Sequence, residues 1–116
     1  MLTLDDEQRM VVQLFAELAE NEFADRAFDW GGAFPWENVR QLAEQGLMGI
    51  NLPEEYGGGG MSEFEAILAI ETIGRVCPDT ANAFYGQSMV APRAIDMFGT
   101  EAVKERYLPP VCAGEA

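Results

Sequence analysis

The chain has 116 residues, of which 48% are hydrophobic, and its 20 acidic and 7 basic side chains give a formal net charge of −13. This length predicts one domain with its own core, and the hydrophobic share excludes a disordered chain. The sequence contains no histidine, so the usual general base and the commonest metal ligand are both missing. The acidic balance argues against nucleic acid or an anionic membrane as a partner, because clustered lysine and arginine bind phosphates.

The negative charge is concentrated in the first part of the chain. Residues 1–71 hold 15 acidic and 3 basic side chains, a net charge of −12, whereas residues 72–116 hold 5 and 4, a net charge of −1. A solvated surface is the ordinary explanation of such a pattern, but a nearly neutral half is also typical of a surface that meets another domain. We therefore expect the acidic half to face solvent and the neutral half to contact further domains.

Neither targeting signals nor metal motifs stand out. The acidic start of the chain is unlike a signal peptide, and no apolar run reaches the roughly 18 residues of a membrane span. Cys77 and Cys112 lie far apart, outside any C-x-x-C pattern. We predict a cytoplasmic protein with two buried free thiols, no metal site and no membrane span.

Apolar residues recur at helical spacing in the first part of the chain. A long helix is expected over residues 4–25, with Thr3 at its capped start and residues 30–32 after its end. A short helix follows Pro35 and stops at Gly46, which is expected to adopt the left-handed conformation of a helix C-terminus.

Four consecutive glycines, at 57–60, follow this short helix. They lack the lysine of a Walker loop and the glycine spacing of a dinucleotide fingerprint, so we interpret them as a flexible or sharply turned structural loop. Ser62 and Glu65 then form a capping-box pattern, which predicts a third helix over residues 62–75.

Two further helices complete the pattern. A fourth is expected over residues 78–98, with a kink or an interrupted turn at Pro92. Thr100 caps a fifth, over residues 100–113, whose end the prolines at 109–110 are expected to make irregular. Five helical segments with short connections predict an all-α fold, an up-and-down helical bundle.

The fourth helix carries small and polar residues on one of its faces. A glycine inside a helix costs about 1 kcal/mol relative to alanine, so Gly86 calls for a reason. Close packing of another helix is the simpler explanation, and a wall of a ligand cavity is the alternative. Both faces are largely apolar or small, so we expect this helix to be surrounded in the assembly that forms. The face in question holds Asn82, Ala83, Gly86, Gln87 and Val90.

Several segments in order, above all GLMGINLPEEYGG at 46–58 and FGTEAVKERYLPPVCAGEA at 98–116, with FPWE at 34–37 before them, resemble the N-terminal helical domain of the acyl-CoA dehydrogenase family. The resemblance covers essentially the whole chain. It implies an FAD-dependent oxidoreductase of fatty acid metabolism that removes hydrogens from the α and β carbons of an acyl-CoA thioester. It also implies an oligomer that passes electrons to an electron-transfer flavoprotein.

The family's chain has three parts, and the resemblance assigns residues 1–116 to the first of them. The middle β-domain, which holds much of the FAD, and the C-terminal helical domain, which carries the usual base, are then absent from this chain, so no catalytic residue is expected here. In the family, the helix before the FGTE motif lines the acyl cavity. This places Asn82, Ala83, Gly86, Gln87 and Val90 at the substrate.

Two alternatives stay open. Acyl-CoA oxidases and flavin monooxygenases share this architecture, and a fold does not determine its chemistry. A non-catalytic helical module or subunit that binds a partner through its neutral half is the other alternative.

Overall fold

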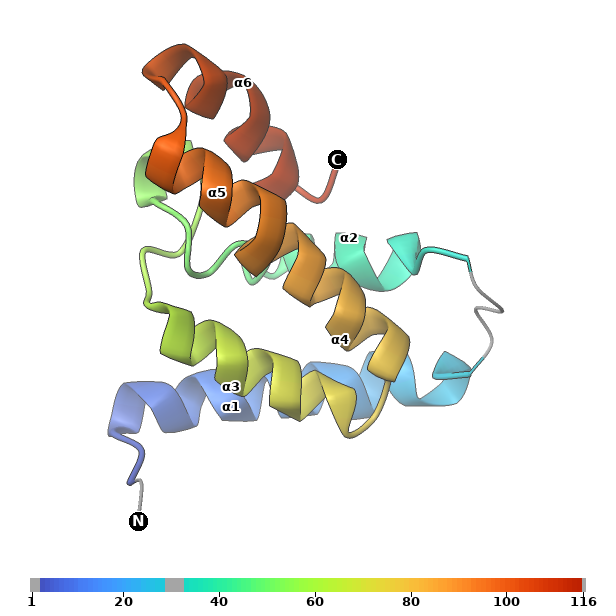
Figure 1. Ribbon diagram of the computed structural model, residues 1–116. Coiled ribbons are helices and arrows are strands. Elements are labelled where there is room, and N and C mark those ends of the chain that lie inside the picture. The colour runs from blue at the N-terminus through green and yellow to red at the C-terminus, as the bar shows by residue number, and fades with distance from the viewer. Residues whose placement is uncertain (1–2, 29–32, 116) are drawn as a thin grey trace.

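The computed structural model describes residues 3–28 and 33–115, and within these ranges the backbone forms helices and loops but no strand (Figure 1). The helices in chain order are α1 (Asp6–Leu18), the π-helical turn η1 (Ala19–Phe23), the 3-10 turn η2 (Ala24–Arg26), α2 (Trp36–Glu44), the 3-10 turn η3 (Glu54–Tyr56), α3 (Glu63–Gly74), α4 (Pro78–Tyr85), the π-helical turn η4 (Gly86–Val90), α5 (Ala91–Phe98) and α6 (Glu101–Cys112). α1 continues through η1 and η2, and α4 continues through η4 into α5. Apart from η3, the described helices thus form five stretches, which confirms the predicted all-α bundle.

Helix starts follow capping chemistry. Asp5, not Thr3, caps α1: its carboxylate accepts the Gln8 N–H at 2.8 Å, and the Gln8 side chain accepts the Asp5 N–H at 3.0 Å. The prediction for Thr3 is wrong because Asp5 has the partner three residues later that a capping box requires. The predicted box of Ser62 with the Glu65 carboxylate is confirmed, and this hydrogen bond lowers the pKa of Glu65.

Helix ends depend on glycine and proline. Gly46 has the predicted left-handed conformation, with φ of 72°. Pro109 and Pro110 lie inside α6, which stays α-helical through both prolines to Cys112, so the expected irregular end is wrong. The two carbonyls that these prolines leave without an N–H donor belong to residues 105–106, which are exposed, so water can satisfy them. The predicted end of the first helix at 30–32 lies outside the described residues.

The interruption predicted near Pro92 is present, one turn earlier than the proline. The helical stretch 78–98 changes from α to π geometry over η4 and returns to α geometry in α5. A proline removes the hydrogen bond to the carbonyl four residues before it, and its ring also crowds that carbonyl. The disturbance therefore falls on the turn that precedes Pro92.

The core lies between α1, α3 and α4, with α2 packed on α4. α1 and α3 lie side by side, and the stretch 78–98 starts beside the end of α3 and runs back toward α6 (Figure 1). Within this core, Phe15 and Phe84 meet edge to face, with ring centroids 5.5 Å apart. A smaller cluster around Leu52 and Leu108 joins η3 to α6. Both cysteines are buried and unpaired, as predicted.

Candidate functional site

A pocket of about 390 Å³ opens between the start of α2 and the middle of the stretch 78–98. Four of the five residues predicted at the substrate, Asn82, Ala83, Gly86 and Gln87, line it together. Val90, the fifth, does not line it and is 49% exposed. The remaining lining residues are Ala33, Phe34, Pro35 and Asp79.

Gly86 faces open space. A Cβ atom built on Gly86 meets no atom within 4 Å, the helix's own nearby backbone aside. The backbone of Gly86 is ordinary right-handed helix, with φ of −61° and ψ of −40°. Neither packing nor backbone conformation among the described residues therefore requires glycine at this position. The space that its missing side chain leaves belongs to the pocket.

The pocket wall is mixed in character. Ala83 is buried, Pro35 is buried, and the Phe34 ring packs on Trp36 with centroids 4.7 Å apart. Among the described lining residues Asp79 alone is charged, and it stands in the first turn of α4, where a carboxylate stabilises the helix N-terminus. Because these described residues include no basic side chain, they suit an uncharged chain better than a phosphate.

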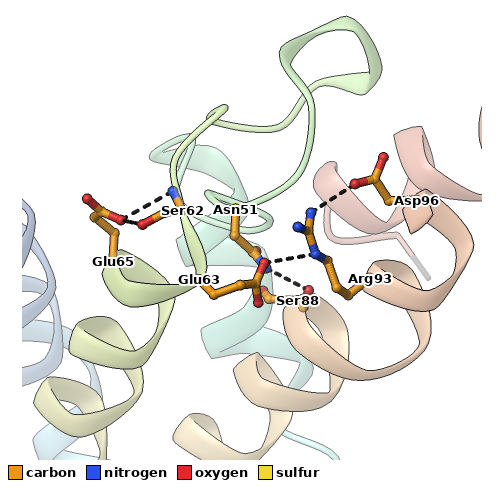
Figure 2. A network of polar contacts seen from close by, with 7 residues as sticks. All are labelled: Asn51, Ser62, Glu63, Glu65, Ser88, Arg93 and Asp96. Carbon is orange, nitrogen blue, oxygen red and sulfur yellow. Dashed lines mark hydrogen bonds and ion pairs between the residues drawn. The ribbon is translucent and has the colours of Figure 1, made fainter.

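A polar network joins the loop after α2 to η4 (Figure 2). The Asn51 side-chain Nδ2 donates to the Ser88 carbonyl at 3.0 Å and to Glu63 Oε1 at 2.8 Å. Arg93 Nε lies 3.1 Å from Glu63 Oε1, and Arg93 Nη1 lies 2.9 Å from Asp96 Oδ2. Sequence reasoning missed this network, since only Pro92, four residues after Ser88, signals that the Ser88 carbonyl lacks a helical donor.

The segment 52–60 is architectural. The Tyr56 hydroxyl donates to Glu101 Oε2 at 2.9 Å and so ties η3 to the start of α6. This hydrogen bond is the main cause that raises the pKa of Tyr56 to about 12.

The backbone N–H groups of the glycine loop at 57–60 could hold the phosphates of a flavin only if they were free to donate to a ligand. All four glycine N–H groups donate to backbone carbonyls of the chain itself, at 2.9 to 3.1 Å, so none points to a ligand. The acceptors are the carbonyls of Glu54, Pro53, Gly49 and Leu52. The loop is therefore a tight structural turn, as interpreted, and it does not fit FAD.

The described residues form neither a cluster suited to a metal ion nor a helix suited to crossing a membrane. No group of three or more acidic or cysteine side chains could hold a metal ion in the part of the chain that the structure describes. Across 3–28 and 33–115, no helix combines the length and the hydropathy that a membrane crossing requires.

Comparison with known proteins agrees with this architecture. The family model described as the N-terminal domain of acyl-CoA dehydrogenase matches residues 5–115. The short-chain-specific acyl-CoA dehydrogenase of Clostridium acetobutylicum is 37% identical, over 97% of this chain and 30% of that protein. A Paraburkholderia xenovorans protein named 3-sulfinopropanoyl-CoA desulfinase is 38% identical, over 99% of this chain and 30% of that protein.

A solved structure shows the same arrangement of helices. Glutaryl-CoA dehydrogenase from Mycobacterium smegmatis matches with a TM-score of 0.85 at 26% identity, over 97% of this chain and 30% of that one. The chain thus spans about 30% of the length of the relatives it matches. Because the family model covers nearly every residue and the fold agrees, the chain belongs to the acyl-CoA dehydrogenase family, as its N-terminal helical domain.

Proposed function

We propose that this chain is the N-terminal domain of an FAD-dependent acyl-CoA dehydrogenase of the cytoplasm, and that the pocket beside Gly86 is one wall of the acyl cavity. The FAD, the catalytic base and the contact with an electron-transfer flavoprotein would then lie outside the described residues. Family membership and the 30% coverage of the relatives support this division.

The role of this chain's own residues is to bind and to shield. Phe34, Pro35 and Ala83 would contact an acyl chain and exclude water from it, while Asn82 and Gln87 would set the polar edge of the wall. The described lining residues include no nucleophile placed beside a base, so no chemical step is assigned to them.

The observation that carries the proposal is the open space at Gly86. In the flavin-loaded protein that contains this domain, Gly86→Leu should fill that space. The variant should raise the KM for long acyl-CoA thioesters about tenfold or more, because the leucine side chain would overlap a long acyl chain and overpacking of this kind costs about 1–3 kcal/mol. The KM for short thioesters should be less affected.

Gly74→Ala is the matched control. Gly74 also lies in a helix, in the last turn of α3, and an added Cβ there makes only an ordinary 3.5 Å contact with Ala81. This control should leave every KM unchanged. Equal KM values for Gly86→Leu and the unaltered protein, across all acyl-chain lengths, would contradict the proposal that this pocket is part of the acyl cavity.

The reaction itself needs a separate test, because the two relatives of nearly equal identity are named for different reactions of acyl-CoA thioesters. An acyl-CoA dehydrogenase should bleach its flavin when mixed with a saturated acyl-CoA, and mass spectrometry should find a product that lacks two hydrogens. A colourless full-length protein, or a substrate that loses another group, would contradict the dehydrogenase.

A further inference from the structure

Pro92 creates a problem within the stretch 78–98. In an α-helix the N–H of residue 92 would donate to the carbonyl of residue 88, but proline has no N–H. Ser88 is completely buried, so water cannot replace the missing donor. A buried carbonyl without a partner is costly and rare in folded proteins.

Asn51 supplies the missing donor from outside the helix. It is 97% buried, at 3% relative exposure, and its Nδ2 lies 3.0 Å from the Ser88 carbonyl oxygen. The same nitrogen donates to Glu63, which Arg93 holds by an ion pair at 3.1 Å (Figure 2). Because both acceptors need the NH₂ group, the amide has only one orientation that satisfies them. Arg93 follows Pro92 directly, so the helix that lacks the N–H also carries the arginine that holds Glu63 beside Asn51.

The turn that this donor holds forms the pocket wall. Gly86 and Gln87 line the pocket and belong to η4, the turn in π geometry. A π turn inserts one residue relative to an α-helix, which rotates the residues on its two sides by about 100° relative to one another. The direction in which Gly86 faces therefore depends on whether η4 keeps its π geometry.

We propose that Asn51 is a positioning residue for the substrate pocket, because its side-chain amide replaces the absent N–H of Pro92 and so fixes the π-helical turn that carries Gly86 and Gln87. The effect on substrate rests on the proposed function of the pocket. The effect on the turn does not, so the two can be tested separately.

The first test measures amide hydrogen exchange in the protein that contains this domain. Asn51→Ala should speed exchange in residues 86–90 by about tenfold or more, because the turn opens more often without its donor. Asn51→Ala with Pro92→Ala should return exchange toward the original rate, since residue 92 then has an N–H for Ser88. Ile73→Val, a core change on α3, is the control and should not act selectively on residues 86–90.

The outcomes of this first test decide the structural half of the proposal. Unchanged exchange in Asn51→Ala, or a double variant as fast as the single one, would overturn it. If Asn51→Ala does not fold, the double variant must fold for the proposal to stand.

The second test measures steady-state kinetics of the flavin-loaded protein with acyl-CoA. The double variant should be stable yet keep a KM several-fold above the original with kcat within about twofold, because an α-helical bond at Ser88 abolishes the π turn that orients Gly86. An original KM in the double variant would reduce Asn51 to a structural role and overturn the positioning. If the unaltered protein turns over no acyl-CoA, the proposed function fails, and hydrogen exchange alone decides the role of Asn51 at the turn.

Discussion

At the level of single residues, the hydrogen bond between Tyr56 and Glu101 predicts a dependence of stability on alkaline pH. The pKa of Tyr56 is raised from 10.0 to about 12, first by this hydrogen bond, so the folded state holds the phenol proton more tightly than the unfolded chain. The resulting stabilisation is complete below pH 10 and is lost as pH rises through 12. The free energy of unfolding, measured in urea at successive pH values, should fall more steeply over this range in the original chain than in Tyr56→Phe.

Glu101→Gln separates the charge from the contact. The amide oxygen still accepts the Tyr56 proton, but the negative charge that opposes ionisation is gone, so the pKa of Tyr56 should move toward its ordinary value. Parallel alkaline curves for Tyr56→Phe and the original chain would show that this phenol does not contribute.

Two glycines of the loops need to be glycine for different reasons. A Cβ on Gly58 would overlap the Leu52 carbonyl and approach the Gly49 carbonyl oxygen to 2.8 Å, whereas one on Gly46 meets nothing within 4 Å. Gly58→Ala should therefore destabilise by about 3 kcal/mol, since backbone cannot yield. Gly46→Ala should cost only about 1 kcal/mol, for its left-handed conformation. Urea unfolding that reverses this order would contradict the loop geometry.

Local patterns explain which residues could be predicted. The Gly46 conformation and the pair Ser62 and Glu65 follow from short-range chemistry, so the sequence alone identifies them. Asn51 acts on Ser88, 37 residues away, and the constraint on Gly58 comes from backbone that folds back on it. Such tertiary contacts leave no periodic signal in a single sequence.

At the level of helices, apolar periodicity correctly located the five stretches, because each buries one face against the core. Proline rules were less reliable. Pro92 disturbs its helix as expected, yet Pro109 and Pro110 do not end α6. The two sites differ in burial: Ser88 is buried, whereas residues 105–106 are exposed. Sequence cannot reveal burial of this kind before the packing is known.

The same helix gives a prediction about stability. Gly86 has helical backbone angles and room for a methyl group, so Gly86→Ala should stabilise the chain by about 0.5–1 kcal/mol through the smaller entropy of the unfolded state. Urea unfolding measures this gain. A loss of stability would mean that an additional contact surrounds Gly86, and the pocket would then be smaller than the structure shows.

At the level of the whole molecule, charge and apolar exposure are distributed differently. Tyr85, Val90 and Met97 of the stretch 78–98 are 46%, 49% and 59% exposed, so the chain's own described residues do not surround this helix. Large apolar side chains are also exposed in the acidic half, as at Met10 and Phe28. That the neutral half alone meets further domains thus remains a prediction from charge, which apolar exposure does not single out.

The charge of the whole chain predicts how salt acts on it. At about 0.01 M salt the screening length is about 30 Å and at about 0.15 M about 8 Å, so across a molecule of 40 × 37 × 21 Å the acidic groups repel one another over much longer distances at the lower salt. With a net charge of −12 on residues 1–71, sodium chloride over this range should raise the unfolding midpoint by a few degrees. Replacing the exposed Glu54 and Glu55 by glutamine should reduce this gain. A midpoint that falls with salt would mean instead that ion pairs such as Arg93 with Glu63 and Asp96 outweigh the repulsion.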